Sequence, residues 1–343
     1  MTHPEPTLAH TEQPLWAVTS YYNPAGYQRR KANYQLFRER LPLPLLTVEW
    51  SPTGDFELRR GDADMLVQLS GGDVMWQKER LLNIGVGHLP PQCTRVAWVD
   101  CDLVFERQDL SDAILAALEA SSLVQLFDRV AYLAPTSLDA LERLGNCANG
   151  CITFEREGAA SAHGVAERAG LPPPDPTDIE DNDPLRPKPS VGFAWAARRE
   201  FLERHPLFDE WVVGGGDSAY FHAAAGLPER VVDRYALAGP LRDQFLVRAR
   251  ELAGAVTRPV DHVAGRVFTL WHGKLEDRRY RSRHSILARY GFDPHRFLQR
   301  SLSGVWEWAD VPDGLPDEIR AYFDQRNEDG ATPSSSPELS ASR

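Results

Sequence analysis

Residues 95–105, Arg-Val-Ala-Trp-Val-Asp-Cys-Asp-Leu-Val-Phe, decide the fold. The run is apolar except for Asp100 and Asp102, a pattern typical of a buried strand that presents acids at the C-terminal edge of a sheet. Carboxylate oxygens at such an edge suit a hard divalent cation or a metal-bound diphosphate. Taken alone, the same Asp-x-Asp pattern fits a solvated turn or a helix N-cap equally well.

Length and composition indicate a folded α/β protein. The chain has 343 residues, 42% of them hydrophobic and 25% charged, which suits one large domain or two ordinary ones. The formal charge of -11 disfavours a broad nucleic-acid surface, although a local basic patch remains compatible with it.

The cysteines and the N-terminus predict a soluble, cytoplasmic protein. Four cysteines, at positions 93, 101, 147 and 151, are too few and too irregular for a disulfide framework, so we expect reduced thiols. A pairing of Cys147 with Cys151 stays open. Residues 1–14 are polar, and no stretch of the chain is long and apolar enough to predict a membrane span.

The hydrophobic patterns on both sides of residues 95–105 alternate between strand and helix. Strands are predicted over 15–22, 43–50, 65–69, 123–127, 190–197, 231–237 and 266–271, and helices over 27–40, 74–84, 111–120, 198–205 and 241–254. This alternation predicts parallel βαβ units, with ligands bound at the carboxyl ends of the strands.

Two segments predict irregular structure. Residues 171–190 are Pro-rich and acidic, which fits a lid or binding loop and a plain disordered insertion equally. From Asn327 onward Gly, Ser, Pro and charged residues predict a disordered tail. We therefore expect a leader over 1–14, one domain over 15–326 with halves of about 15–130 and 131–326, and a tail over 327–343.

Two more motifs carry candidate chemistry. Three glycines, 214–216, precede Asp217 at the start of a predicted helix; on its own this pattern favours an N-cap over a functional acid. His272 follows a predicted strand and precedes a basic run over 278–284. Such a histidine is usually structural, and such a run is usually a solvated helix face.

Taken in order, four motifs resemble the nucleotide-sugar-dependent glycosyltransferases of the GT-A fold. The motifs are Trp-Gln-Lys-Glu-Arg-Leu-Leu-Asn-Ile-Gly at 76–85, Trp-Val-Asp-Cys-Asp-Leu at 98–103, the segment 211–221 and Leu-Trp-His at 270–272. They are most similar to the beta-1,4-galactosyltransferase family and bacterial family 2-like enzymes, over residues 16–287. The resemblance implies a Rossmann-like α/β fold with a central, mostly parallel mixed sheet flanked by helices and an Asp-x-Asp motif at a strand end.

The resemblance also implies site roles. Asp100, Asp102 and His272 would bind Mn²⁺ or Mg²⁺, which acts as a Lewis acid on the departing nucleoside diphosphate. Asp217 would be the general base on the acceptor hydroxyl, giving inversion at the anomeric carbon. Gly216 departs from the family, which has Glu there to hold the acceptor sugar, so the acceptor stays open.

Further residues match donor-binding positions of this fold. The implied contacts to the donor, a UDP-sugar by resemblance, come from Thr19, Tyr21, Glu49, Lys78, Asn83, Asp100, Arg278, Tyr280 and Arg283. Packing is an equal alternative for Thr19, Tyr21 and Glu49. Trp306 and Trp308 fit an acceptor pocket, with core filling the favoured alternative.

The predicted function is therefore a metal-dependent hexosyltransferase acting on a hydroxyl-bearing acceptor such as a glycan. Three alternatives stay open: a retaining transferase in which Asp217 binds the acceptor without deprotonating it, a non-catalytic nucleotide-sugar or carbohydrate binding protein, and a transferase acting on modified nucleic acid. The net charge disfavours the last one.

Overall fold

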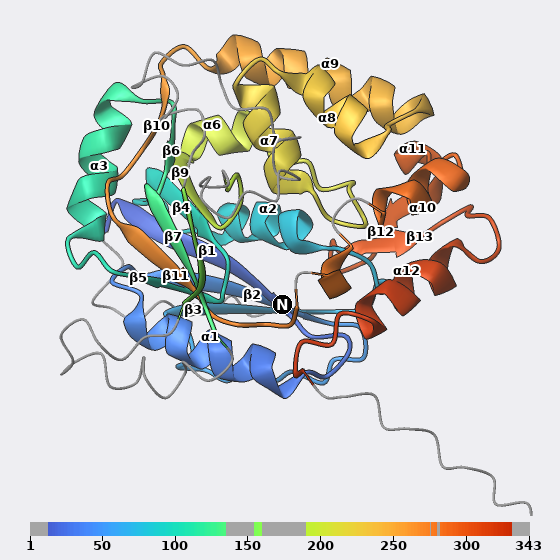
Figure 1. Ribbon diagram of the computed structural model, residues 1–343, viewed down its shortest axis with the longest axis horizontal. Helices are drawn as coiled ribbons and strands as arrows, with labels where there is room; N and C mark the ends of the chain where they lie inside the picture. Colours follow the sequence, from blue (N-terminus) through green and yellow to red (C-terminus); the bar gives the residue numbers. More distant parts are fainter. Residues whose placement is uncertain (1–12, 135–153, 160–189, 275, 280–281, 331–343) are drawn as a thin grey trace, which may run out of the picture.

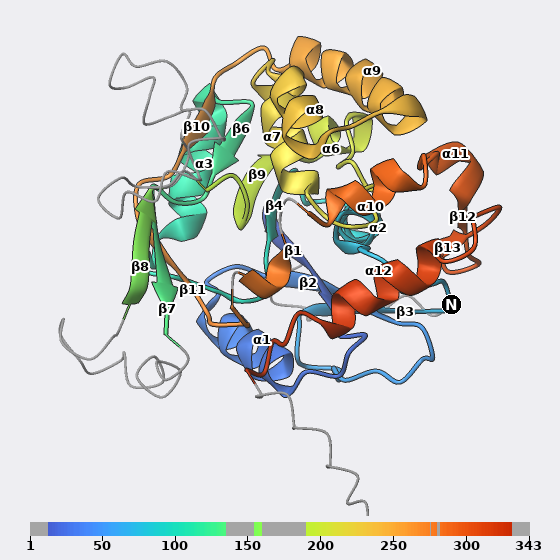
Figure 2. The same ribbon diagram turned by 45° about the vertical axis from the view of Figure 1, so that its right-hand side comes forward.

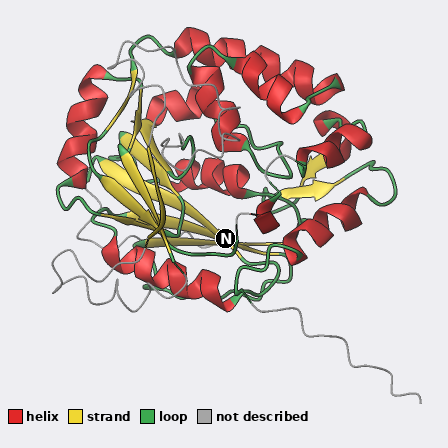
Figure 3. Cartoon of the chain, viewed as in Figure 1, coloured by secondary structure: helices red, strands yellow, loops and turns green. Residues whose placement is uncertain are grey.

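A seven-stranded sheet forms the centre of the protein (Figure 1 and Figure 3). The computed structural model describes residues 13–134, 154–159, 190–274, 276–279 and 282–330. In the central sheet the order is β10-β6-β9-β4-β1-β2-β3, and only β9 runs against its neighbours. The predicted α/β class with a mostly parallel mixed sheet is confirmed.

The strands and helices have the following bounds. The strands are β1 Leu15–Tyr22, β2 Leu45–Ser51, β3 Met65–Ser70, β4 Arg95–Val99, β5 Leu103–Phe105, β6 Leu123–Gln125, β7 Arg129–Leu133, β8 Phe154–Ala159, β9 Ala194–Arg198, β10 Val260–His262, β11 Arg266–Thr269, β12 Leu298–Arg300 and β13 Trp306–Trp308. The helices are α1 Gln28–Arg40, α2 Lys78–His88, α3 Leu110–Ala120, α6 Arg199–Arg204, α7 Gly216–Ala224, α8 Pro228–Tyr235, α9 Gly239–Ala255, η3 Glu276–Arg278, α10 His284–Arg289, α11 Pro294–Phe297 and α12 Leu315–Asp324.

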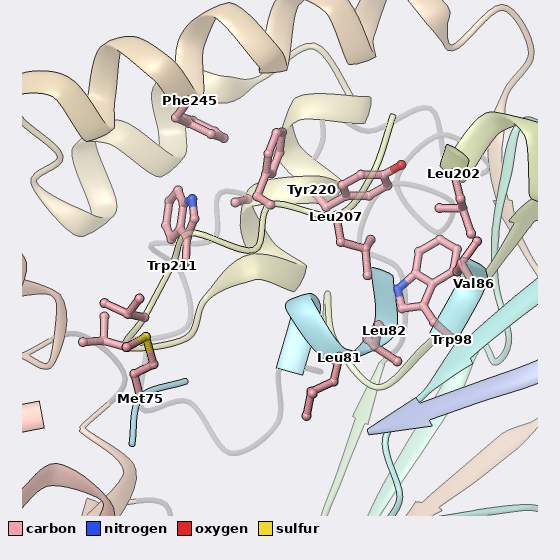
Figure 4. Packing of buried hydrophobic residues seen from close by; sticks show 14 of the residues in the cluster. Met75, Leu81, Leu82, Val86, Trp98, Leu202, Leu207, Trp211, Tyr220 and Phe245 are labelled. Carbon is pink, nitrogen blue, oxygen red and sulfur yellow. The ribbon is translucent and has the colours of Figure 1, made fainter. Parts of the chain in front are cut away.

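Two layers of helices cover the sheet because its strands are apolar on both faces. In β1, Trp16 and Val18 belong to the core on the side of α2, whereas Leu15 and Ala17 belong to the core under α1 and α3. Figure 2 shows α1 on one side of the sheet, with α2 and the α6–α9 group on the other. Figure 4 shows how Leu81, Leu82 and other large side chains fill the second side.

Residues 95–105 form two strands rather than the single strand that their apolar pattern predicts. β4 ends at Val99, the chain turns at Cys101 and Asp102, and β5 joins a second sheet of order β5-β11-β7-β8. The turn lets both carboxylates leave the apolar interior, while Cys101 stays buried among apolar neighbours. Cys93 and Cys101 are free thiols; Cys147 and Cys151 lie outside the described residues.

Several predictions about individual elements are wrong. Residues 231–237, predicted as a strand, lie largely in α8, where Pro228 starts the helix and Val231, Val232 and Tyr235 share its buried face. Helix α2 begins at Lys78 rather than after Asp73, whose carboxylate instead accepts from the backbone N–H of Trp308.

Three further predictions concern the Pro-rich loop, the two halves of the domain and membrane spans. Most of the Pro-rich loop lies outside the described residues, and the division into two halves stays a prediction. Across the described ranges, no helix is long and apolar enough to cross a membrane.

Candidate active site

Lys78 joins two of the predicted acids at the carboxyl edge of the sheet. Its ammonium lies 2.5 Å from Oδ1 of Asp100, just after β4, and 2.7 Å from Oδ2 of Asp217, in the first turn of α7. Lys78 is only 7% exposed. Although burial lowers the pKa of Lys78, Asp100 and Asp217 raise it well above its ordinary value, so the side chain remains a cation.

Glycines place Asp217 where Lys78 can reach it. Gly214 and Gly215 have φ angles of 88° and 99°, and a Cβ on Gly215 would lie 2.8 Å from Cε1 of His284. A larger residue therefore could not make this turn into α7. Asp217 lies within the first turn and turns its carboxylate toward Lys78, so it is not the N-cap that its local pattern favoured.

Glu79 is a third acid at this point, and the sequence did not single it out. The side chain is buried, and Nε1 of Trp76 donates to its Oε2 at 3.0 Å. Burial and the nearby Asp217 raise the pKa of Glu79 to about 8, so the carboxyl is protonated at neutral pH. We call Lys78, Glu79, Asp100 and Asp217 the acid cluster.

The missing side chain of Gly216 makes room for Glu79. A Cβ at position 216 would lie 2.4 Å from Oε1 of Glu79 and 2.5 Å from its Cδ. The carboxyl group that this region contains therefore comes from helix α2 rather than from residue 216. No local sequence signal predicts this arrangement, because positions 79 and 216 meet only in the folded chain.

An aromatic wall adjoins Asp217 on one side. A cavity of about 10 Å³ lies among Asp217, Leu123 and four aromatic side chains, those of Trp98, Trp195, Tyr220 and Phe221. This volume holds roughly one water molecule. A sugar ring must therefore reach Asp217 from another direction, and the apolar wall limits the access of water to the carboxylate.

Asp102 and His272 form a second group beside the acid cluster. Nδ1 of His272 lies 2.9 Å from Oδ2 of Asp102 and 2.7 Å from the carbonyl oxygen of Leu270. Both neighbours are acceptors, so Nδ1 carries a proton. Oδ1 of Asp102 is buried and has no hydrogen-bond partner among the described residues.

The predicted trio of metal ligands is not assembled. Within the described residues, no three His, Cys, Asp or Glu side chains lie close enough together to form a metal site. The turn after β4 sends Asp100 to Lys78 and Asp102 to His272. The unpartnered Oδ1 of Asp102 is nevertheless an oxygen ligand of the kind that a divalent cation takes together with phosphate and water.

Three arginines surround Glu328 next to this pair. Glu328 accepts from Nε and Nη2 of Arg30 at 3.0 and 2.9 Å, and its Oε1 lies 2.8 Å from Nη2 of Arg326 and 3.9 Å from Nη2 of Arg278. Burial by itself raises the pKa of Glu328, but the three guanidinium groups lower it to about 2. We call Arg30, Arg278, Arg326 and Glu328 the arginine cluster.

Hydrogen bonds and ion pairs hold Glu328 and Asp329, near the end of the described residues, beside His272 and the start of α1. Arg278 donates to the carbonyl oxygen of His272 at 2.8 Å. Asp329 accepts from the backbone N–H groups of Gln28 and Arg29 at the start of α1. Residues 327–330, which composition assigned to a disordered tail, are thus packed, because their charges meet partners that are remote in sequence; residues 331–343 lie outside the described range.

Four predicted donor contacts are used by the fold itself. The Thr19 hydroxyl donates to the carbonyl oxygen of Val99, and the Tyr21 hydroxyl donates to Glu57. The others are equally engaged: Glu49 accepts from the backbone of Glu57 and Leu58 and from Gln68, and Asn83 bonds to Leu207 and Asp209. Their roles toward a nucleotide stay predictions.

The remaining predicted residues have mixed positions. Arg283 is buried, donates to the Tyr322 hydroxyl and lies 5.4 Å from the ring centre of Trp76; Tyr280 lies outside the described residues. Trp306 donates to the carbonyl oxygen of Asp209 and contacts the guanidinium groups of Arg80 and Arg300. These contacts favour a packing role for Trp306.

Comparisons with known proteins find solved structures of low similarity and identify no family. No protein-family profile matches the chain, and no curated protein matches it in sequence. Similar solved structures include S. aureus TarS 1-349 in complex with UDP-GlcNAc (11% identity, TM-score 0.38, 92% of this chain and 72% of that chain) and the mannosyltransferase PcManGT from Pyrobaculum calidifontis in complex with GDP-Man and Mn²⁺ (14%, 0.37, 90% and 69%). Against a longer S. aureus TarS structure (11%, 0.37), the chain covers 43% of that chain. With TM-scores below 0.5, these structures identify no family, so the resemblance to beta-1,4-galactosyltransferases stays a prediction.

Proposed function

We propose that this chain is a glycosyltransferase that moves a sugar from a nucleoside diphosphate sugar to an acceptor hydroxyl. The donor that we propose is a UDP-sugar. The observation that supports this transfer most is the double contact of Lys78 with Asp100 and Asp217. The Lys78 side chain lies between the candidate base, Asp217, and Asp100, the acid that follows β4. Ligands of open α/β sheets bind at this edge.

In the proposed reaction Asp217 takes the proton of the acceptor hydroxyl. The hydroxyl oxygen attacks the anomeric carbon, the bond from that carbon to the phosphate oxygen breaks, and the nucleoside diphosphate leaves. Direct displacement of this kind inverts the anomeric configuration. Lys78 holds the Asp217 carboxylate in place, and the aromatic wall limits competing hydrolysis by water.

Asp102 and His272 would hold the divalent cation of the donor. When bound, Mn²⁺ or Mg²⁺ would supply positive charge against the departing diphosphate. Oxygen and imidazole ligands together favour Mn²⁺ over Mg²⁺. The contact of Asp100 with Lys78 makes Asp100 a neighbour of this metal site rather than its first ligand.

Thermal-shift titration with UDP-, GDP- and dTDP-sugars, with and without Mn²⁺, tests the proposal. One donor should raise the melting temperature in a metal-dependent way, because a ligand that binds the native state stabilises it. Asp102→Asn should abolish this response, whereas Asp112→Asn, on the exposed side of α3, should keep it. If no donor stabilises the wild-type protein, the proposal is wrong.

Product analysis separates the mechanistic alternatives. The coupling constant of the anomeric proton, measured by NMR on the product, should show inversion relative to the donor. Retention would instead make Asp217 a residue that binds the acceptor without deprotonating it. Donor binding without either transfer or hydrolysis would identify a non-catalytic binding protein.

A further inference from the structure

A basic pocket lies between helix α12 and the described residues that precede and form α10. Its volume is about 260 Å³, close to the lower end of the roughly 300–1,000 Å³ typical of ligand sites. The lining residues come from two short stretches of the chain: Arg279, Ser282, Arg283, Ser285, Ile286 and Arg289 on one side, and Glu318, Ala321, Tyr322 and Gln325 on the other.

The lining carries more positive than negative charge. Among the described residues, the lining contains three arginines and one carboxylate, that of Glu318, which is paired with Arg289. Arg289 also donates to the Ser285 hydroxyl at 3.1 Å. The guanidinium group of Arg279 is exposed and has no partner among the described residues. A pocket with this excess of guanidinium charge attracts an anion.

The basic run of the sequence divides its arginines between two environments. Arg278 and Arg283 are buried and engaged with the carbonyl oxygen of His272 and the Tyr322 hydroxyl. Arg279 has a φ of 47°, a left-handed conformation that non-glycine residues rarely adopt. Strained backbone of this kind often marks a functional position, and among the described arginines of the run Arg279 is the exposed one whose guanidinium group has no partner.

We propose that this pocket binds a phosphate group of a substrate. Guanidinium groups match the geometry of phosphate oxygens, and the serine hydroxyls add further donors. The pocket is also connected to the acid cluster: Arg283 lines it and lies over Trp76, whose Nε1 donates to Glu79. The side chains of Arg283 and Trp76 thus connect the pocket to Glu79 of the acid cluster.

The phosphate has two possible sources, the diphosphate of the donor or a phosphorylated acceptor. Both present the same chemistry to Arg279 and Arg289. The assignment to a substrate rests on the proposed function, whereas phosphate binding by the pocket does not. Direct binding measurements without turnover therefore test the pocket separately.

The test compares wild type with Arg279→Gln/Arg289→Gln and with the matched control Arg320→Gln, an exposed arginine on α12 outside the pocket. Inorganic phosphate is titrated by calorimetry at constant ionic strength. The Kd should rise about tenfold or more in the double variant, because hydrogen bonds to charged groups are lost, and should be unchanged in the control. No saturable binding to wild type, or equal weakening in both variants, would overturn the proposal.

Competition assigns the source of the phosphate. If UDP displaces phosphate from wild type and binds the double variant more weakly, the pocket receives the donor diphosphate. If UDP binds all three proteins equally and leaves phosphate bound, the pocket receives a phosphorylated acceptor. Both results support a phosphate site, and neither depends on the transfer reaction, so failure of the pocket and failure of the proposed function are distinguishable.

Discussion

The acid cluster and the arginine cluster both combine buried and half-buried charged groups but have opposite charge balance. In the first, one ammonium group, that of Lys78, faces three carboxyl groups. In the second, three guanidinium groups surround one carboxylate, that of Glu328. Each cluster therefore depends on a single side chain of opposite charge.

The two buried glutamates show what this difference does. Burial raises the pKa of Glu79 to about 8, with Asp217 adding to the effect. Glu328 is at least as buried, yet its arginine neighbours lower its pKa to about 2. Neighbouring charge, rather than burial alone, thus decides which acid is ionised at neutral pH. In the proposed reaction the acid-rich side serves the acceptor and the arginine-rich side adjoins the metal and the leaving diphosphate.

Removal of the proposed base should have the largest effect. Asp217→Asn should lower kcat by about 10²- to 10⁴-fold, the usual contribution of a general base, while the fold is kept. Donor-to-acceptor transfer rates and a melting curve measure both quantities. The control is Asp233→Asn on the exposed face of α8. Nearly full activity in Asp217→Asn would assign the base elsewhere.

Removal of the lone counter-charge should distinguish the clusters. Lys78→Met and Glu328→Gln should each cost about 3–5 kcal/mol of unfolding free energy at pH 8, because each leaves buried charges unpaired. At pH 5 the cost of Lys78→Met should shrink, since Glu79 is then protonated, whereas Glu328 stays ionised and its cost persists.

Urea denaturation at both pH values measures these costs. Glu203→Gln, which removes a half-exposed partner of Arg199, is the matched control and should cost less than about 1 kcal/mol. An equal pH dependence of the two buried variants would contradict the difference in charge balance between the clusters.

Position 216 tests the packing of the acid cluster. Gly216→Ala should destabilise the protein by about 1–3 kcal/mol, because its Cβ meets the Glu79 carboxyl at 2.4 Å. Glu79→Ala should relieve most of this cost, so the two substitutions should be non-additive in a double-mutant cycle. Gly87→Ala in α2, where a Cβ meets nothing within 4 Å, is the control. Additive effects would mean that Glu79 does not fill this space.

The pH dependence of stability tests the ionisation of the two buried glutamates. The pKa of Glu79 is raised from its ordinary 4.5 to about 8, so the native state holds a proton that the unfolded state releases in this interval. Stability should therefore fall as pH rises through it, by about 1.4 kcal/mol per pH unit. This slope should be reduced in Glu79→Gln, and absent there above about pH 7, because below that pH Asp100, whose pKa burial raises from 3.8 to about 7, contributes a slope of the same sign. Glu328 has the opposite sign, and its contribution should be lost as pH falls from about 4.5 to about 2.

The sequence by itself predicted the alternating strands and helices, because buried parallel strands and amphipathic helices are local patterns. Asp100, Asp102, Asp217 and His272 followed from the ends of such elements. The error at α8 arose because Val231 and Val232 suit a strand as well as one face of a helix.

Only the tertiary structure decided how these residues pair. The turn after β4 separated Asp100 from Asp102. The glycine at position 216 left space for the Glu79 side chain of another helix. Glu328 pairs with Arg30, which lies almost 300 residues away in the sequence. Burial and charge neighbourhood are properties of the folded chain, and they set the ionisation of each acid. The sequence thus determined which chemical groups are present, and packing determined which of them form ion pairs and which acids are ionised.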